Sequence, residues 1–260
     1  MSGNSNGKHN GVDIRSESPL ETLGNAVSKA IDPYGVTTSL LAASGMRRDQ
    51  MPALVEGSAP SGQLRRELAE RWGTTAECIA VDAGADALLL LFLRLFCQVG
   101  DAVVLTAGSY PTFPYFARGC GVNLFECPYT DTLQHDLTAL AAAAEQHQAK
   151  LVYSANPDNP TGSVYSFAEI AAFRARLPSD TFLLLDEAYI DFADTPNASA
   201  VSLIDKYDNL VVTQTFSKSR SLAGLRVGMA FANHSLIEAL NRYKNSFNSY
   251  PLDRLAQAGA

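Results

Sequence analysis

The chain has 260 residues, of which 47% are hydrophobic and 18% charged, and its net charge is −7 at pH 7. This length and composition are typical of a globular protein with one substantial, well-buried core, and the acidic balance without a basic cluster argues against nucleic-acid binding. The longest apolar stretch, Ala87–Cys97, is interrupted by Arg94, and it is too short to cross a bilayer.

The first sixty residues are predicted to precede the main domain. Residues 1–19 are polar and lack the apolar segment of a signal peptide, so we expect a flexible tail there. A helical pattern over 20–31 and a turn-rich stretch follow, and we expect residues 20–60 to form an N-terminal arm or part of a small domain. A second helical pattern, Gly62–Trp72, opens the predicted main domain, residues 61–260.

Short apolar runs alternate with helical patterns from about Glu77 onward. The predicted strands are Cys78–Val81, Ala102–Ala107, Asn123–Tyr129, Lys150–Ala155, Thr181–Ala188, Asn209–Phe216 and Arg226–Asn233. The predicted helices are Ala85–Phe96, Leu137–Gln148, Ser166–Leu177 and Ser235–Phe247. Strands that are apolar throughout are buried on both faces, so the alternation predicts an α/β domain whose mostly parallel, seven-stranded sheet lies between helices. Pro251 and Asp253 indicate one more helix start.

The cysteines and histidines do not indicate a metal site. The four cysteines form no C-x-x-C pair and lie near apolar residues, so we expect buried free thiols in a reducing cytoplasm. The four histidines are scattered without the spacing of metal ligands, and we therefore expect no metal.

Polar residues follow five of the predicted strands. The segments are "DAGAD" (82–86), "GSYPTFPYF" (108–116), "NPDNPTG" (156–162), "DEAYIDF" (186–192) and "SKSRSLAGLR" (217–226). Because ligands of open α/β sheets bind at the carboxyl ends of the strands, we expect these segments to converge on one site.

The residue types at these strand ends favour one kind of ligand. A glycine-containing turn at a helix start binds anions such as phosphate, and an arginine adds a bidentate clamp. A carboxylate at the end of an apolar strand can hold a protonated ring nitrogen, and a lysine among small residues can attack a carbonyl. A tyrosine can stack on a flat ring. Together these groups describe a site for a phosphorylated pyridine aldehyde, pyridoxal phosphate.

Three motifs carry a specific resemblance. "TFSKSRSLAG" (Thr215–Gly224) resembles the lysine signature of class-II pyridoxal-phosphate aminotransferases, and "NPDNPTG" and "DEAY" resemble the two other hallmarks of fold-type-I aminotransferases. "LAGLRVG" and "GAD" before an apolar helix are most similar to histidinol-phosphate aminotransferases and the related threonine-phosphate decarboxylases. The resemblance extends from about Tyr34 to the C-terminus and implies the large domain of a fold-type-I pyridoxal-phosphate-dependent transferase.

The resemblance implies catalytic roles for residues of all three motifs. Lys218 would bind the cofactor covalently and later move a proton. Asp186 would pair with the protonated ring nitrogen, so that the ring can accept electrons. Tyr189 and Asn159 would hydrogen-bond the phenolic oxygen of the cofactor. Asn159 can equally be a turn residue between two prolines, where a cis Asn–Pro bond is possible.

The other residues implied by the resemblance surround the cofactor. Those that would hold its phosphate, through side chain or backbone, are Arg226, Ser217, Thr215, Gly84, Ala85 and Asp86. Tyr110 would stack on the ring, although it can also be a packed aromatic residue. Tyr34, in "DPYG", is similar to a tyrosine on the substrate side of the family's site. Arg220 is expected to be a solvated or structural side chain.

The implied activity is amino transfer between histidinol phosphate and 2-oxoglutarate by a cytoplasmic homodimer, in histidine biosynthesis. Two alternatives stay open: decarboxylation of threonine phosphate, and a catalytically inactive cofactor-binding or dimerisation module. An ATPase, suggested by "LLLDE" (183–187), is disfavoured because no G-x-x-x-x-G-K-[ST] loop is present.

Two departures from the family pattern affect these expectations. Family members carry a tyrosine that reaches the phosphate of the neighbouring subunit, but the corresponding stretch, Ala53–Ala69, contains none. Family members also continue for roughly a hundred residues beyond this C-terminus, a length consistent with a small domain. The resemblance therefore implies a truncated chain that ends within its last helix and lacks the small C-terminal domain. The arginine that binds the substrate carboxylate in the family belongs to that domain and would be absent as well.

Overall fold

The computed structural model describes residues 61–194, 198–246, 248 and 251–260. The expected tail, the expected arm over residues 20–60 and the candidate substrate residue Tyr34 lie outside the described residues. The described residues up to Ala258 belong to one compact unit. Within this part of the chain, no helix has the length and apolar character that crossing a membrane requires.

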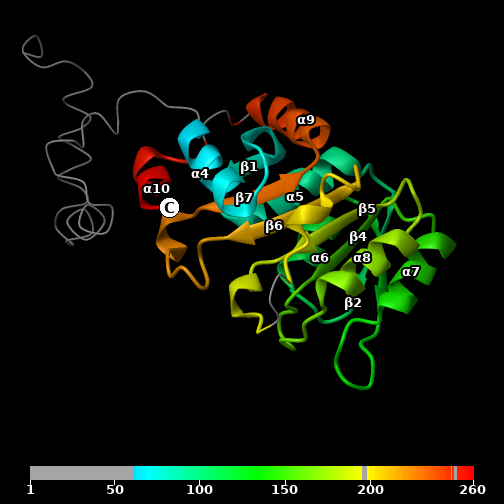
Figure 1. The fold of residues 1–260 in the computed structure, drawn as a ribbon. Coiled ribbons are helices and arrows are strands. Elements are labelled where there is room, and N and C mark those ends of the chain that lie inside the picture. Colours follow the sequence, from blue (N-terminus) through cyan, green and yellow to red (C-terminus); the bar gives the residue numbers. More distant parts are fainter. Residues whose placement is uncertain (1–60, 195–197, 247, 249–250) are drawn as a thin grey trace, which may run out of the picture. The chain divides into compact units, whose positions relative to one another are not determined.

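Seven strands form a single mixed sheet (Figure 1). They are β1 (Ile79–Asp82), β2 (Ala102–Thr106), β3 (Asn123–Cys127), β4 (Leu151–Ala155), β5 (Phe182–Asp186), β6 (Leu210–Thr215) and β7 (Gly228–Ala232). Their order is β1-β7-β6-β5-β4-β2-β3, and all neighbouring pairs are parallel except those of β7, which is antiparallel to both β1 and β6. Strands β1, β4, β6 and β7 are buried at every position. The mostly parallel, doubly covered seven-stranded sheet expected from the sequence is confirmed.

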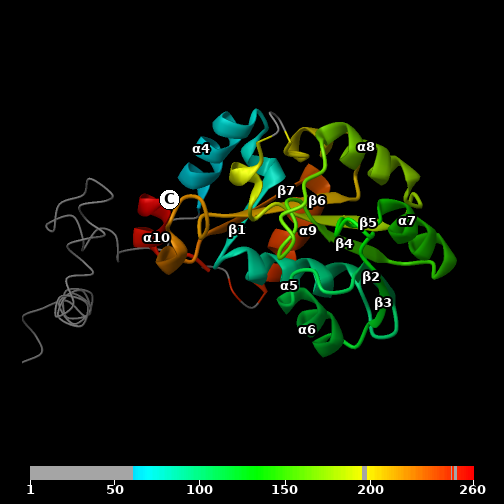
Figure 2. The same ribbon diagram turned by 90° about the horizontal axis from the view of Figure 1, so that it is seen from below.

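Helices cover both faces of the sheet (Figure 2). On one face lie α4 (Gly62–Trp72), α7 (Leu137–Gln146) and α8 (Phe167–Arg176), and on the other α5 (Ala85–Phe96), α6 (Thr112–Gly119) and α9 (His234–Asn245). Each face has its own apolar core: Leu64, Leu140 and Phe173 belong to the first, and Phe92, Phe113 and Leu240 to the second. Both cores are needed because the central strands present apolar side chains alternately to the two faces.

The remaining elements of the described residues are short helices. They are α10 (Arg254–Gly259) and the 3₁₀ turns η3 (Ala76–Cys78), η4 (Ile190–Phe192), η5 (Val201–Leu203) and η6 (Ala223–Leu225). Asp253 is the N-cap of α10 and accepts a hydrogen bond of 2.8 Å from the Ala256 amide. At α8, Ser166 and Glu169 form the expected capping box, in which each side chain bonds the backbone amide of the other. The helix starts expected at both places are confirmed.

Helix α6 is the element that the sequence pattern did not indicate. It begins after Pro111 and contains Pro114, two residues that normally indicate a loop. Pro111 is the N-cap and Pro114 lies in the first turn, positions where the backbone amides have no partner within a helix and a proline therefore costs little. The apolar Phe113 and Ala117, four residues apart, hold the helix against the sheet.

The four cysteines are free, as expected. Cys78 and Cys127 are buried, whereas Cys97 and Cys120 are partly exposed, so the expectation that all four are buried was wrong for these two. Both are the residues that directly follow a helix, Cys97 after α5 and Cys120 after α6.

Candidate active site

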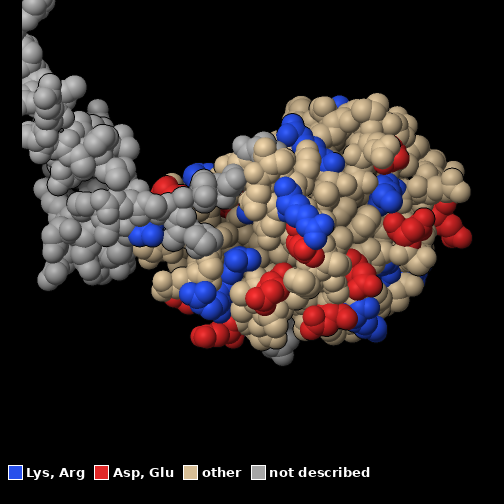
Figure 3. Space-filling view, turned by 90° about the horizontal axis from the view of Figure 1, so that it is seen from above, with Lys and Arg blue, Asp and Glu red and all other residues tan. Residues whose placement is uncertain are grey.

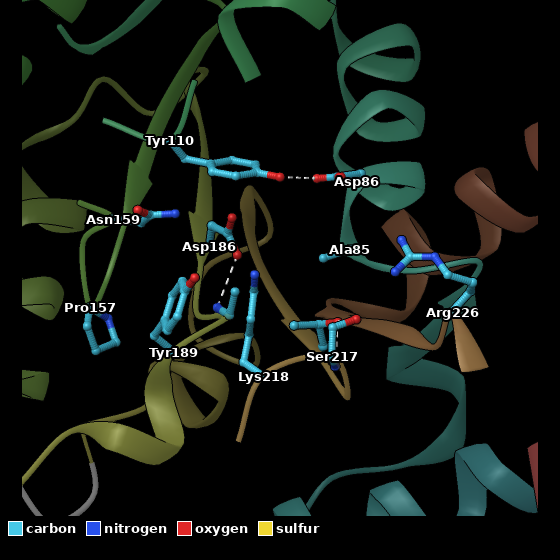
Figure 4. Close-up of a pocket in the computed structure, with 13 residues that line it drawn as sticks. Ala85, Asp86, Tyr110, Pro157, Asn159, Asp186, Tyr189, Ser217, Lys218 and Arg226 are labelled. Atoms are coloured by element: carbon cyan, nitrogen blue, oxygen red, sulfur yellow. Dashed lines mark hydrogen bonds between the residues drawn. The ribbon is translucent and has the colours of Figure 1, made fainter. Parts of the chain in front are cut away.

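One pocket lies at the sheet edge where β1, β2, β4, β5 and β6 end and β7 begins (Figure 4). It contains about 570 Å³ of empty space, with open solvent at its mouth included. The residues that line it are Ala85, Asp86, Tyr110, Ala155, Pro157, Asn159, Asp186, Ala188, Tyr189, Thr215, Ser217, Lys218 and Arg226. The five polar segments predicted to converge on one site therefore do so.

Asp186 is a buried acid in the pocket wall, at the end of β5. Its Oδ2 accepts a hydrogen bond of 3.1 Å from the Tyr153 hydroxyl, and its Oδ1 accepts bonds from the Ala188 amide and the Thr213 hydroxyl. Burial raises the pKa of Asp186 to about 6, although these three hydrogen bonds act in the opposite direction. A cationic group in the pocket would offset the cost of keeping this carboxylate charged.

Lys218, Tyr189 and Asn159 form the neighbouring part of the pocket. Lys218 is exposed and follows β6, and its Nζ lies 5.2 Å from the centroid of the Tyr189 ring. Figure 4 shows the Lys218 amine and the Asn159 amide pointing into the same space. An amine, a phenol and an amide thus face one ligand volume beside a buried carboxylate. The peptide bonds Asn156–Pro157 and Asn159–Pro160 are both cis.

The opposite end of the pocket is suited to an anion. The first residues of α5, Ala85 and Asp86, line it, and the start of a helix carries unpaired amide groups and a partial positive charge. Ser217 lines it as well, and the hydroxyls of Thr215 and Ser217 are 3.0 Å apart. Arg226 adds an exposed guanidinium on a left-handed backbone (φ 52°), a conformation that a non-glycine residue rarely adopts.

Two glycines permit this end of the pocket to form. A Cβ on Gly228 would lie 2.3 Å from the carbonyl carbon of Gly84 and 2.4 Å from the amide nitrogen of Ala85. A Cβ on Gly84, whose φ is +90°, would lie 2.6 Å from Nη2 of Arg226. Gly84 does not line the pocket itself, but its lack of a side chain leaves room for the guanidinium of Arg226.

Tyr110 and Asp86 are joined across the pocket. The Tyr110 hydroxyl donates a hydrogen bond of 2.9 Å to Oδ1 of Asp86 (Figure 4). Burial raises the pKa of Tyr110 to about 12, which keeps this donor protonated at neutral pH. The bond fixes the tyrosine ring over the ligand volume.

The candidates named from the sequence are therefore almost all together in one pocket. The exceptions are Gly84, which lies behind the wall, and Tyr34, which is outside the described residues. Arg220 is structural, as expected, since its Nε lies 3.5 Å from the Asp191 carboxylate and its guanidinium covers the Phe216 ring. The sequence did not indicate Tyr153, whose hydroxyl donates a hydrogen bond to Asp186. No local signal shows that a tyrosine inside a buried strand has a polar partner.

The surface around the described domain carries both signs of charge. On the face shown in Figure 3, lysine and arginine side chains are interspersed with aspartate and glutamate, without a wide area of one sign. A long-range field that steers one highly charged partner is not evident on this face.

Comparison with known proteins is consistent with this geometry. The model of the family "Aminotransferase class I and II" matches residues 41–260. Histidinol-phosphate aminotransferase 2 of Psychrobacter arcticus is 46% identical over 206 residues, which are 77% of this chain and 53% of the relative. Aromatic amino acid aminotransferase of Corynebacterium diphtheriae is 35% identical over 247 residues, or 95% of this chain and 69% of the relative.

A solved structure shares the fold. The histidinol-phosphate aminotransferase of Sinorhizobium meliloti, solved in complex with pyridoxal-5'-phosphate, has a TM-score of 0.77 and 30% identity, covering 95% of this chain and 70% of that one. The chain spans about half the length of the Psychrobacter relative. The family match over most of the chain and the similarity to these relatives lead to one assignment: the chain belongs to the class I and II aminotransferase family.

Proposed function

We propose that this protein is a pyridoxal-phosphate-dependent aminotransferase of the histidinol-phosphate type. The observation that carries the proposal is the meeting in one pocket of Asp186 at the end of β5, Lys218 after the end of β6, and Arg226 before the start of β7. The Sinorhizobium relative binds pyridoxal-5'-phosphate, and several relatives are named histidinol-phosphate aminotransferases. Because the chain spans only part of these relatives, its activity and substrates are proposals.

The residues of the pocket fit this cofactor. The start of α5, Ser217 and Arg226 form an anion site at one end of the pocket. A Cβ on Gly228 would collide with the backbone of Gly84 and Ala85 at the start of α5. Asp186 offers a buried carboxylate for a protonated ring nitrogen, and Lys218 offers a primary amine for the aldehyde. An anion site, an amine and a carboxylate around one volume are the groups that a phosphorylated pyridine aldehyde requires.

Each residue would then have a separate task. When bound, pyridoxal phosphate supplies an aldehyde carbon that can exchange amines and a ring that takes up an electron pair. Asp186 would hold the proton on the ring nitrogen, and Tyr189 and Asn159 would bond the phenolic oxygen. Lys218 would attach the cofactor and, once displaced by the substrate amine, carry a proton on its Nζ to and from the substrate carbon. Thr215 would orient Ser217 toward the phosphate, and Tyr110 would cover the ring.

We also propose that the protein works in the cytoplasm as a homodimer, with an amino acid or amino phosphate and a 2-oxo acid as its substrates. The free state of the four described cysteines and the family membership support this proposal. Residues 61–260 would form the cofactor-binding part, and Tyr34 stays a predicted substrate contact. Sedimentation velocity at several concentrations tests the dimer.

The substrate assignment is tested with the cofactor-loaded protein. We expect glutamate to form when histidinol phosphate and 2-oxoglutarate are both present, and no carbon dioxide to be released from threonine phosphate. Release of carbon dioxide without formation of glutamate would show that the protein is a decarboxylase and not an aminotransferase. A protein that holds the cofactor but performs neither reaction would be an inactive binding module.

A further inference from the structure

Asp158 is a buried carboxylate of the "NPDNPTG" segment that does not line the pocket. Its Oδ1 accepts a hydrogen bond of 2.6 Å from the Ser109 hydroxyl and lies 3.1 Å from Nε2 of His135. Its Oδ2 accepts bonds of 2.8 Å from the Tyr129 hydroxyl and 2.8 Å from the Thr161 hydroxyl, and a 3.3 Å bond from the Thr161 amide. Five donors thus surround the carboxylate of one residue that is 3% exposed.

This carboxylate is charged in the folded protein. Burial acts to raise its pKa, but hydrogen bonds from His135 and Ser109 outweigh burial and hold the pKa of Asp158 well below its usual range. The His135 ring, 1% exposed, places Nε2 within 3.1 Å of two acceptors, the Asp158 carboxylate and the Ala155 carbonyl. Two acceptors at one nitrogen require a hydrogen there, so His135 is a donor to Asp158.

The donors come from segments that are far apart in the sequence. Ser109 follows β2 and is 49 residues from Asp158, whereas Tyr129 and His135 follow β3. Nδ1 of His135 lies 2.7 Å from the Thr106 hydroxyl, which adds the end of β2 to the same network. The carboxylate therefore joins three chain segments at the edge of the sheet where the pocket lies.

Two residues next to this network line the pocket. Tyr110 follows Ser109, and Asn159 follows Asp158. The segment around Asn159 is closed on Asp158 by two backbone bonds, from the Asp158 amide to the Ser163 carbonyl and from the Gly162 amide to the Asp158 carbonyl, 2.9 and 3.0 Å long. Movement of Asp158 away from Ser109 would therefore change the distance between Tyr110 and Asn159.

We propose that Asp158 is a positioning residue, which, held by Ser109 and His135, fixes Asn159 relative to Tyr110 and so sets the width of the slot for the cofactor ring. The inference rests on the proposed function for the identity of the ligand, but not for the network itself. Asp158 acts through its neighbours in the sequence, and it touches no ligand. A charged acceptor suits this task because bonds to it are stronger and shorter than bonds between neutral groups.

The test removes one donor rather than the carboxylate, because replacing Asp158 would disturb five bonds at once. Ser109→Ala deletes the buried hydroxyl that bonds Asp158, and Tyr129→Phe is a second variant that deletes another donor. Thr181→Val is the matched control: it also deletes a buried hydroxyl bond, of 2.8 Å to the Ala149 carbonyl, at the opposite end of β5 from the pocket.

The first measurement is amide hydrogen exchange in the cofactor-free protein. In Ser109→Ala and Tyr129→Phe, exchange in residues 156–163 is expected to be about ten-fold faster than in the wild type, because a bond that anchors the Asp158 side chain to a neighbouring segment is lost. Thr181→Val should leave exchange in this segment unchanged. Equal exchange in Ser109→Ala and wild type would overturn the proposal, whether or not the protein binds a cofactor.

The second measurement is the affinity for pyridoxal phosphate, together with the visible circular dichroism of the bound cofactor. Ser109→Ala should lower the affinity about ten-fold and change the dichroic band, whereas Thr181→Val should change neither. Faster exchange with unchanged affinity and dichroism would show that the network does not set the slot, and would overturn the proposal. A wild-type protein that does not bind pyridoxal phosphate would contradict the proposed function, and the exchange comparison would then decide the network separately.

Discussion

The hydroxyl of Tyr153 donates a hydrogen bond of 3.1 Å to Oδ2 of Asp186. The ring of Tyr153 is stacked on the ring of Phe113, with 4.0 Å between the two ring centroids. The stack holds the phenol in place, so the hydroxyl is a fixed donor to the carboxylate of the pocket. Burial raises the pKa of Tyr153 well above its ordinary value, which keeps the donor protonated.

Tyr153→Phe removes this donor and leaves the stack. We expect the cofactor-free protein to lose about 1–3 kcal/mol of unfolding free energy at pH 7, where Asp186 is charged, and less at pH 5, where it is mostly protonated. Urea unfolding at the two pH values measures this difference. Tyr165→Phe is the control, because its hydroxyl donates to the neutral carbonyl of His135 and its cost should not depend on pH. An equal loss for Tyr153→Phe at both pH values would contradict the assigned role.

Asp186→Asn is expected to stabilise the cofactor-free protein at neutral pH. The pKa of Asp186 is raised from 3.8 to about 6 in the folded state, so the folded protein binds this proton more tightly than the unfolded chain does. Its contribution to stability is therefore complete below about pH 4 and falls as the pH rises to about 6. At pH 7 the variant should be more stable than the wild type by roughly 2 kcal/mol, and equally stable near pH 4.

Glu187→Gln provides the comparison for this variant. Glu187 is fully buried beside Asp186, burial raises its pKa to about 7, and it bonds Ser199, the Ala200 amide and Gln214 instead of lining the pocket. Both substitutions should reduce the loss of stability between pH 4 and 7, but only Asp186→Asn should abolish tight binding of pyridoxal phosphate. Equal affinities in the two variants would show that Asp186 does not contact the cofactor.

Gly228→Ala should damage the anion end of the pocket. The added methyl group would meet the backbone between Gly84 and Ala85, which has no flexible part that can move aside. We expect a loss of at least about 2 kcal/mol in unfolding free energy and weaker phosphate binding. Gly224→Ala, where no atom lies within 4 Å of the added carbon, should leave both unchanged. Chemical unfolding and phosphate titration compare the two variants. Unchanged stability and phosphate affinity in Gly228→Ala would mean that β7 can shift to make room for the methyl group.

Arg226→Gln separates the phosphate from the rest of the cofactor. Because a guanidinium binds a phosphate by charge-assisted bonds, the affinity for pyridoxal phosphate should fall about ten-fold to a hundred-fold, while the affinity for pyridoxal should not change. Arg220→Gln, which breaks the pair with Asp191, is the control for loss of a positive charge nearby. If both ligands weakened equally, Arg226 would support the pocket instead of the phosphate.

Local signals predicted most of the elements, and one rule of sheet topology predicted where the pocket lies. Helix α5 begins after Gly84 and ends at Phe96, as expected, because a continuous apolar run of this length indicates a buried helix and a glycine precedes it. The segments that carry Asp186 and Lys218 were predicted to meet because the carboxyl ends of parallel strands lie at one edge. These features depend on neighbours within a few residues or on one topological rule.

Features that depend on distant contacts were not predictable in this way. Ser109 and Asp158 are 49 residues apart, and nothing in "GSY" or "NPDN" indicates that their side chains bond. His135 has no metal-ligand spacing, yet its burial against Asp158 gives it a definite partner. Helix α6 was missed because a proline at its N-cap and another in its first turn indicate a loop when the packing against the sheet is not known.

The most direct test of the account is whether Lys218 bonds pyridoxal phosphate. The protein is incubated with the cofactor, reduced with borohydride and digested, and the modified peptide is identified by mass spectrometry. The exposed Lys206, which lies beside Tyr207 and away from the pocket, gives the control variant Lys206→Ala. The account predicts a visible absorption band and a single modified lysine, Lys218, in wild type and Lys206→Ala, and neither in Lys218→Ala. A folded wild-type protein without the band, or one modified equally at other lysines, would contradict the central claim.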